Sequence, residues 1–207
     1  MNLEATDTLA LAAFEEALLW QFLHHLHRAP DDRQWQWLQR PETAKTWQIL
    51  NVTLELALAE ELPLPPSLAA YQDDHLHTFE VGAPAPPCPL VEHHWIPHRP
   101  ASVVLAENAR FFSHFGLKPS GSSGETADQL RFQLEFMAHL CNMASRLYGE
   151  DSTELAGQAL TASRDYLTLH LLSWLPTAAE SLNQSFPKAW YSVWMTGTAR
   201  AAQALAA

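Results

Sequence analysis

Residues Thr126 to Gly149, with the sequence TADQLRFQLEFMAHLCNMASRLYG, contain the pattern that decides the fold class. At 100° per residue on a helix, the apolar side chains fall on two stripes, one beginning at Leu130 and the other at Phe132. Most of the circumference of this helix must therefore be buried. The remaining polar strip is either a solvent-exposed row of ion pairs or the floor of a binding groove. It consists of Asp128, Arg131, Glu135, His139, Asn142 and Arg146.

The rest of the 207-residue chain also favours helices over strands. The whole chain contains seven glycines, many alanines and leucines, and few alternating β-branched stretches. The sequence therefore predicts an all-α protein, a single-domain helical bundle that extends over residues 1–207. Helices are expected at about 3–28, around 35–37, at 41–58, 67–79, 102–115 and 126–148, from 153 to 175, and after 187.

Local signals predict how individual helices begin, end and face. The motif DSTE at 151–154 resembles a capping box that opens a helix, and Pro176 is expected to break that helix. The segment SGSSG at 120–124 is expected to be a flexible tip. In the first helix, apolar residues at intervals of three or four predict an amphipathic face. They are Leu11, Phe14, Leu18, Phe22 and Leu26.

A proline-rich segment from Glu80 to Pro100 interrupts the helical pattern. Its six prolines disfavour regular helix, because each lacks an amide donor and restricts the residue before it. About twenty residues of irregular chain are uncommon inside a compact domain unless they have a role. The segment is therefore either a functional loop or the join between helical halves at about 1–79 and 101–207. The sequence is compatible with a monomer and with a domain-swapped dimer that exchanges halves through this loop.

The charge balance narrows the classes of partner. The chain has 12 Lys and Arg against 23 Asp and Glu, a formal net charge of −11, whereas nucleic-acid binding relies on clustered basic residues. A basic partner is favoured instead. No apolar run is long enough to predict a membrane span, and the first seven residues contain acids where a secretory leader needs bases. Together with two cysteines outside any CxxC motif, these features predict a cytoplasmic protein.

Eleven histidines suggest metal binding as an alternative function. The best candidate is the loop stretch EHH at 92–94 with the histidine at 98, because an irregular backbone can turn several donors inward. A metal site also needs ligand number, geometry and supporting hydrogen bonds together, and the sequence shows only donors. We therefore favour histidines that are solvated or bonded within the core. The ligands in the alternative are His75, His77, His93, His94 and His98.

Four short segments, in order along the chain, resemble one protein family. They are LWQFL at 19–23, PCPLVE at 87–92, DQL at 128–130 followed by LEFM at 134–137, and DYL at 165–167 followed by WLP at 174–176. Together they are similar to the TorD/DmsD/NarJ family of redox-enzyme maturation chaperones. The wording of the second and fourth segments is closest to the branch that serves type II enzymes of the dimethyl-sulfoxide-reductase group. Val91 replaces an aromatic residue of the family, and Gln129 replaces its usual histidine.

The resemblance implies an all-helical chaperone that is not an enzyme and has no cofactor of its own. Its implied partner is the apo catalytic subunit of a molybdenum oxidoreductase, in several members including the twin-arginine leader, held ready for cofactor insertion. The absence of a GxSxG motif agrees with this interpretation. A leader offers two arginines beside an apolar stretch, and carboxylates next to an apolar groove would suit it.

Six residues are the candidate client-binding site. Two of them follow from position alone. Trp95 lies in the proline-rich segment, where no helical face explains it and an amphipathic aromatic ring can border a groove. His139 lies on the polar strip one helical turn after Glu135. The other four match the family's motifs, and the resemblance implies that they bind the client. These four are Glu92, Asp128, Gln129 and Glu135.

Overall fold

The computed structural model of the chain describes residues 3–58, 60–118, 125–187 and 189–206. Helices account for most of these residues, and the one β interaction among them is an isolated antiparallel bridge between Val91 and Gln129. The predicted all-α class is confirmed. The α-helices are α1 (Leu3–Leu26), α2 (Asp32–Leu38), α3 (Pro41–Thr53), α4 (Leu68–His75), α5 (Glu92–Trp95), α6 (Ala101–His114), α7 (Leu130–Gly149), α8 (Thr153–Tyr166), α9 (Leu172–Ser185) and α10 (Trp190–Ala206). Two π-helical segments are η1 (Leu76–Glu80) and η2 (Leu167–Leu171).

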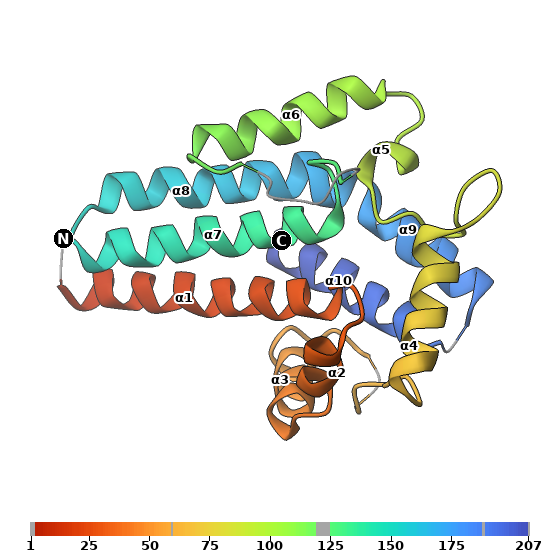
Figure 1. The fold of residues 1–207 in the computed structure, drawn as a ribbon. Coiled ribbons are helices and arrows are strands. Elements are labelled where there is room, and N and C mark those ends of the chain that lie inside the picture. The colour runs from red at the N-terminus through yellow and green to blue at the C-terminus, as the bar shows by residue number, and fades with distance from the viewer. Residues whose placement is uncertain (1–2, 59, 119–124, 188, 207) are drawn as a thin grey trace.

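Three long helices form the layer around which the other helices are arranged (Figure 1). α7 lies between α1 and α8 and packs against both (Figure 1). α6 packs on the same layer, with the ring of Phe112 centred 4.8 Å from the ring of Phe136 in α7. α9 and α10 pack against each other near the start of α7, and α2 and α3 lie beside the C-terminal end of α1 (Figure 1).

The first apolar stripe predicted for α7 is buried, and the second is buried except at Met143 and Leu147, which are half-buried. Leu134 and Leu140 have no exposed surface, and Phe136 retains 2%. On the polar strip, Glu135 and Arg146 are exposed, as the pattern predicts. Complete burial of one large apolar side chain stabilises a fold by about 1.5–3 kcal/mol. The packing of α7 is therefore a major part of the stability of the whole molecule.

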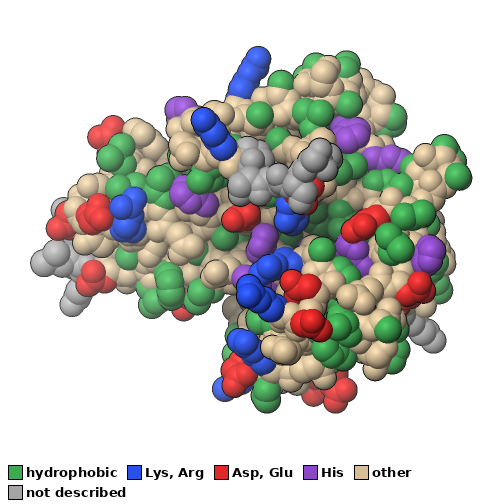
Figure 2. All heavy atoms as spheres, in the orientation of Figure 1, with side chains coloured by type: hydrophobic (Ala, Val, Ile, Leu, Met, Phe, Trp, Pro, Cys, Tyr) green, Lys and Arg blue, Asp and Glu red, His purple; other side chains and the backbone are tan. Residues whose placement is uncertain are grey.

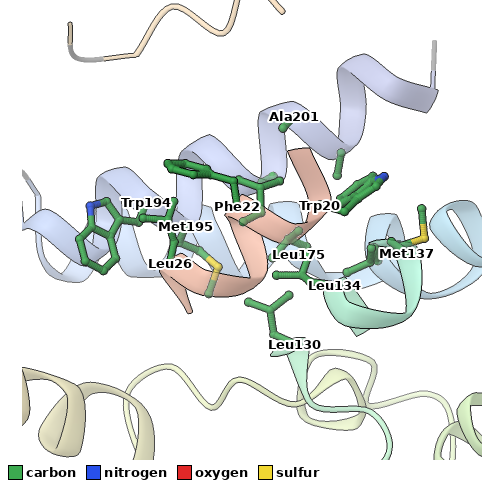
Figure 3. Close-up of a cluster of buried hydrophobic side chains, with 14 of the residues drawn as sticks. Trp20, Phe22, Leu26, Leu130, Leu134, Met137, Leu175, Trp194, Met195 and Ala201 are labelled. Carbon is green, nitrogen blue, oxygen red and sulfur yellow. The ribbon is translucent and has the colours of Figure 1, made fainter. Parts of the chain in front are cut away.

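Large tryptophans from opposite ends of the chain are fully enclosed in the core. Trp20 of α1 and Trp194 of α10 retain 0% and 1% of their surface, and their indole N–H groups donate to Glu16 and to the carbonyl of Pro63. In Figure 3 these two rings lie at opposite ends of the buried cluster, with Leu134 between them. The core therefore joins segments from the beginning, middle and end of the chain.

The apolar face predicted for α1 is the buried one only near its C-terminal end. Phe22 and Leu26 are buried, whereas Leu11, Phe14 and Leu18 remain 57%, 44% and 47% exposed. Alanines lie on the buried face before that end, because small side chains let two helices approach closely. They are Ala13, which packs with Ala144 of α7, and Ala17.

The end of α3 and the start of α7 differ from the predicted boundaries. α3 ends at Thr53 rather than near residue 58, because Glu55 and Ala57 have left-handed backbone conformations with φ of 51° and 50°. α7 begins at Leu130 rather than near residue 126, with Gln129 as its N-cap. The acid at position 128 therefore precedes the helix instead of opening it.

The capping box predicted at residues 151–154 does not form. Ser152 is the N-cap of α8, but its side chain makes no capping hydrogen bond. Its backbone N–H donates instead to the carbonyl of Leu147 at 2.8 Å, and Asp151 has a left-handed φ of 58°. Both features close the C-terminal end of α7. The conformation of the short turn between α7 and α8 is thus set by the C-cap of α7 rather than by an N-cap of α8.

Pro176 does not break the helix that precedes it. It lies inside α9, and the chain continues as helix from Thr153 through η2 to Ser185. The π-helical turn changes the hydrogen-bond register directly before α9, which accommodates a residue without an amide donor.

The proline-rich segment is irregular at residues 81–91, but its second half contains the short helix α5. The prediction of irregular chain throughout 80–100 is therefore wrong at residues 92–95, because residues 90–96 contain no proline. The flexible tip predicted at 120–124 lies outside the described residues. Among the helices that the structure describes, none combines the length and apolar character that crossing a bilayer requires.

Candidate functional site

The second and third motif segments meet at the start of α7. The backbone N–H of Glu92 donates to the carbonyl of Asp128 at 3.1 Å, and that of Leu130 donates to the carbonyl of Leu90 at 3.0 Å. These two bonds form the bridge between Val91 and Gln129. The loop before α5 is thereby fixed against the residues that lead into α7. Three of the candidate site residues, Glu92, Asp128 and Gln129, are therefore close together.

Asp128 is completely buried, and residues of its own chain occupy its carboxylate. One oxygen accepts the backbone N–H of His93 at 2.9 Å and the ring nitrogen Nδ1 of the same residue at 2.7 Å. The other oxygen accepts the hydroxyl of Thr126 at 2.6 Å. The geometry makes Asp128 a clamp between the start of α5 and the start of α7.

Glu92 is also completely buried and lies at the centre of a polar network. Its carboxylate accepts the amide of Asn108 in α6 at 2.9 Å, the amide of Gln133 in α7 at 2.6 Å, and Nδ1 of His170 in η2 at 3.0 Å. Charge-assisted hydrogen bonds of this kind are stronger than neutral ones. One side chain therefore joins four helical segments inside the core.

Two aromatic residues extend the network. The indole N–H of Trp174 donates to the side-chain carbonyl of Gln133 at 3.1 Å, and the hydroxyl of Tyr166 donates to the side-chain carbonyl of Asn108. Burial, with smaller contributions from the carboxylates of Glu92 and Asp128, raises the pKa of Tyr166 well above its usual value, so the hydroxyl stays a donor. Every buried side-chain nitrogen and oxygen among the described residues has a hydrogen-bond partner.

Sequence reasoning did not assign a role to Asn108, Gln133, Tyr166, His170 and Trp174. A signal for the last three is present in their spacing of four residues, which places them on one face of a helix. The fourth motif segment contains Tyr166 and Trp174, so the network connects three of the four motif segments.

Gln129 lies on the solvent side of this region, in a cleft of about 180 Å³ that is bordered by the end of α1, by η1 and by the loop before α5. Its side-chain carbonyl accepts Nε of Arg131 at 3.3 Å, and Arg131 also pairs with Glu125 at 2.5 Å. Figure 2 shows acidic, basic and histidine side chains mixed on the face where the start of α7 and the end of α1 meet. The cleft has both polar and apolar walls, and its charged side chains are largely paired.

Glu135 and His139 line a second cavity, of about 120 Å³, on the side of α7 that faces α6. Its walls include Phe132 and Phe136. Glu135 is exposed and makes no hydrogen bond or ion pair that the structure records within its described ranges. Burial, assisted by the charge of Arg146 and opposed by Glu135, lowers the pKa of His139, so its ring is largely neutral at pH 7. This cavity therefore combines apolar walls with an available carboxylate.

Trp95 lies at the end of α5 and is half-buried, with its indole N–H donating to the carbonyl of Pro89 at 2.8 Å. Its neighbour His94 is exposed. Trp95 thus holds the loop before α5 by a hydrogen bond within the same segment. Its role at the border of a groove stays a prediction.

The histidines of the alternative metal site do not converge. His75 pairs with Glu80 at 3.2 Å, His77 with Asp73 at 3.4 Å, and His93 with Asp128. Across the described ranges, no three His, Cys, Asp or Glu side chains lie close enough to hold a metal ion together. The geometry therefore gives the metal-binding alternative no support.

A buried histidine predicts how stability depends on pH. His27 is buried, bonds through Nε2 to the hydroxyl of Thr198 at 2.8 Å, and burial lowers its pKa to about 3. Below pH 6.5 His27 takes up a proton in the unfolded chain but not in the folded protein, and this uptake stabilises the unfolded state. The free energy of unfolding is therefore unaffected by protonation of His27 above pH 6.5 and decreases as the pH falls below that value. At about 1.4 kcal/mol per pH unit, we expect a loss of about 2 kcal/mol between pH 7 and pH 5.

Urea unfolding of the His27→Gln variant at both pH values checks this expectation. Burial also lowers the pKa of His24 and His75, so the wild-type protein loses stability from several sites. The variant should lose about 2 kcal/mol less than the wild type over the same interval. An equal loss in both proteins would contradict the assignment to His27.

Comparison with known proteins places these residues in a family context. The family model described as "Nitrate reductase delta subunit" matches residues 40–180, a range that includes all six candidate site residues. The perchlorate reductase assembly chaperone protein of Dechloromonas aromatica (strain RCB) is 29% identical over 126 residues, which are 61% of this chain and 55% of that protein. The chlorate reductase assembly chaperone protein of Ideonella dechloratans is 32% identical over 111 residues, 53% of this chain and 55% of that protein.

A third relative matches a shorter region. Chaperone protein TorD of Vibrio cholerae serotype O1 (strain ATCC 39315 / El Tor Inaba N16961) is 41% identical over 69 residues, 33% of this chain and 30% of that protein. The chain thus matches between about a third and about half of the length of these relatives. No solved structure gives a significant match.

Proposed function

This chain belongs to the nitrate reductase delta subunit family, and from that membership we propose that it is an assembly chaperone for the catalytic subunit of a molybdenum oxidoreductase. The family match across residues 40–180 is the observation that carries the proposal. The names of the relatives support it, since perchlorate and chlorate reductases are the enzymes that two of them assemble. The resemblance identified from the sequence is confirmed.

In this proposal the protein acts in the cytoplasm, binds the apo catalytic subunit and holds it for cofactor insertion. Its twin-arginine leader is part of what the chaperone grips. The chaperone performs no reaction of its own. The formal net charge of −11 supports a client segment with basic residues, because the long-range field of the chain attracts them.

The six candidate residues divide into two groups in this proposal. Glu92 and Asp128 shape the binding surface from within, because their carboxylates are enclosed and bonded to their own chain. Glu135, with Phe132 and Phe136 in the wall beside it, offers direct contact to an arginine next to an apolar segment. His139, Gln129 and Trp95 border these surfaces.

The free-energy contributions of the different contacts indicate which interactions bind the client. An ion pair between exposed groups contributes under about 1 kcal/mol, whereas a hydrogen bond to a charged group removed from water contributes about 1.5–3 kcal/mol. Glu135 is exposed before binding, so it adds affinity mainly if the client covers it. The apolar walls must therefore supply much of the binding energy, and micromolar affinity is expected.

Reversal of charge at Glu135 tests the contact surface. We expect Glu135→Arg to reduce the amount of co-expressed catalytic subunit that co-purifies by about tenfold, because a like charge then faces the client's arginines. The subunit is the molybdenum oxidoreductase encoded nearest to the gene of this chain, produced with and without its leader. Retention of the leaderless form alone would assign the grip to the mature subunit.

The matched control is Glu180→Arg, which makes the same charge change at an exposed position of α9. Circular dichroism should be unchanged for both variants. Full retention of the subunit by Glu135→Arg would remove Glu135 from the contact surface. Failure of the wild-type chain to retain any molybdenum oxidoreductase subunit would overturn the proposed function itself.

A further inference from the structure

A groove of about 780 Å³ lies between α6, α7 and α8, at the opposite end of α7 from the region around Gln129. Its apolar walls are Phe111 of α6 and Phe115 at the C-cap of that helix, with Met143 and Leu147 of α7. These four side chains are half-buried, so each retains apolar surface that the fold does not cover. A partner that covers this apolar surface removes it from water, which favours binding.

The α8 side of the groove lets another helix come close. Its floor consists of Ala159 and Ala162, whose small side chains leave room for a partner, and Leu155 projects at the edge with 54% of its surface exposed. Helices with small residues at the contact allow short distances between axes. The groove can therefore accept an apolar surface from a partner, such as one face of an amphipathic helix.

The charges around the groove are opposite in sign to those of the chain as a whole. Arg110 and Arg146 border it, together with His114 and a single acid, Asp165. Arg146 has only a loose, solvent-exposed pair with Glu150 at 3.9 Å, and no ion pair to Arg110 is recorded within the described part of the chain. In a protein with 23 acids and 12 bases, two arginines beside one apolar groove favour an acidic partner there.

We propose that this groove binds an amphipathic helix of a partner protein, with its apolar face on the groove walls and its acidic residues at Arg110 and Arg146. The two arginines, the apolar walls and the small residues of α8 together favour this occupant. A second copy of the chain is disfavoured, because two molecules of formal net charge −11 repel each other. The inference does not depend on the proposed chaperone function, whose contact surface attracts a basic segment at another part of α7.

Two synthetic amphipathic peptides provide the test. They share the same Leu and Phe residues on the apolar face, and their polar faces carry Glu in one peptide and Lys in the other. Fluorescence anisotropy with the full chain measures both dissociation constants at low salt. We expect the Glu peptide to bind about fivefold more tightly, although the overall field of the chain favours the Lys peptide.

Charge reversal of the groove should invert this preference. The double variant Arg110→Glu/Arg146→Glu should bind the Glu peptide about tenfold more weakly than the wild type and should bind the Lys peptide more tightly. The matched control, Arg33→Glu/Arg40→Glu, changes two exposed arginines around α2 and should keep the wild-type preference. Leu155→Ser, at an exposed position, should weaken both peptides about threefold, because the apolar contact is common to them.

Several results would overturn the proposal. Equal affinity for the two peptides, tighter binding of the Lys peptide by the wild type, or a Glu preference that survives the double reversal would each exclude recognition by these arginines. Sedimentation of the wild type that shows a concentration-dependent dimer, lost in the double variant, would assign the groove to a second copy instead. Circular dichroism identifies any variant that fails to fold, and the Leu155→Ser variant then tests the groove without a charge change.

Discussion

Glu92→Ala is expected to lower the free energy of unfolding by about 3–5 kcal/mol, the largest effect of any single substitution considered for this protein. The substitution removes the acceptor of one N–H of Asn108, one N–H of Gln133 and Nδ1 of His170, all of which are buried. The remaining bonds of the two amides, to the carbonyl of Val104 and the side-chain carbonyl of Asn108, are unaffected. An unsatisfied buried polar group costs about 1–3 kcal/mol, and the cavity left by the side chain adds to this. Urea unfolding at pH 7 measures the difference, with an unchanged slope as the sign of two-state behaviour.

Two further variants make the Glu92 result specific. Glu92→Gln keeps the shape of the side chain but places an amide donor among donors, so it should cost about 1–3 kcal/mol. Glu61→Ala removes an exposed acid and should change the free energy of unfolding by less than about 0.5 kcal/mol. A Glu92→Ala protein as stable as Glu61→Ala would show that the network contributes little to the fold.

Asp128→Ala should lower the free energy of unfolding by about 2–4 kcal/mol. The carboxylate accepts three hydrogen bonds at 2.6–2.9 Å, and its removal leaves the amide of His93 and the hydroxyl of Thr126 without their acceptor. Local opening should increase as well, since these bonds fix the start of α5 to the start of α7. Native-state hydrogen exchange should then show faster exchange of the His93 amide than in the wild type.

The Asp128 result also separates two roles for this residue. The family resemblance implies contact with the client, whereas the geometry gives Asp128 internal partners. A carboxylate that served only the client would be dispensable for folding, and its removal would change stability by less than about 0.5 kcal/mol. Unchanged stability with unchanged exchange at His93 would therefore favour direct contact and contradict the clamp between α5 and α7.

The sequence predicts the orientation of α7 well because its apolar residues leave only one narrow polar strip. Only an orientation with this strip outward buries both Leu134 and Phe136, and that orientation exposes Glu135. In α1 the same reasoning selected residues that turn out to be exposed, such as Leu11 and Leu18. The first half of α1 has apolar residues on several faces, and the close approach of alanines to α7 decides between them, which hydropathy alone does not reveal.

The sequence allowed the carboxylates of the candidate site to be identified, but it did not indicate which of them are buried and which are exposed. Glu92, Asp128 and Glu135 were identified from motifs that look alike in sequence, yet the first two are enclosed and the third is exposed. Whether a carboxylate is enclosed depends on donors far away in the chain, and single-sequence periodicity carries no information about such pairs. The second half of the network, around Asn108 and Trp174, was missed for the same reason.

The long sequence separations within the Glu92 network have a kinetic consequence. Its hydrogen bonds join residues 16, 41 and 78 positions apart, so each one closes a loop of increasing entropic cost. Contacts of this kind are expected to form after the barrier to folding has been crossed, when α1, α7 and α8 are already assembled. Damage to the network should then accelerate unfolding and leave the refolding rate nearly unchanged. The side chain that joins four helical segments would thus govern how long a folded molecule survives rather than how quickly it is made.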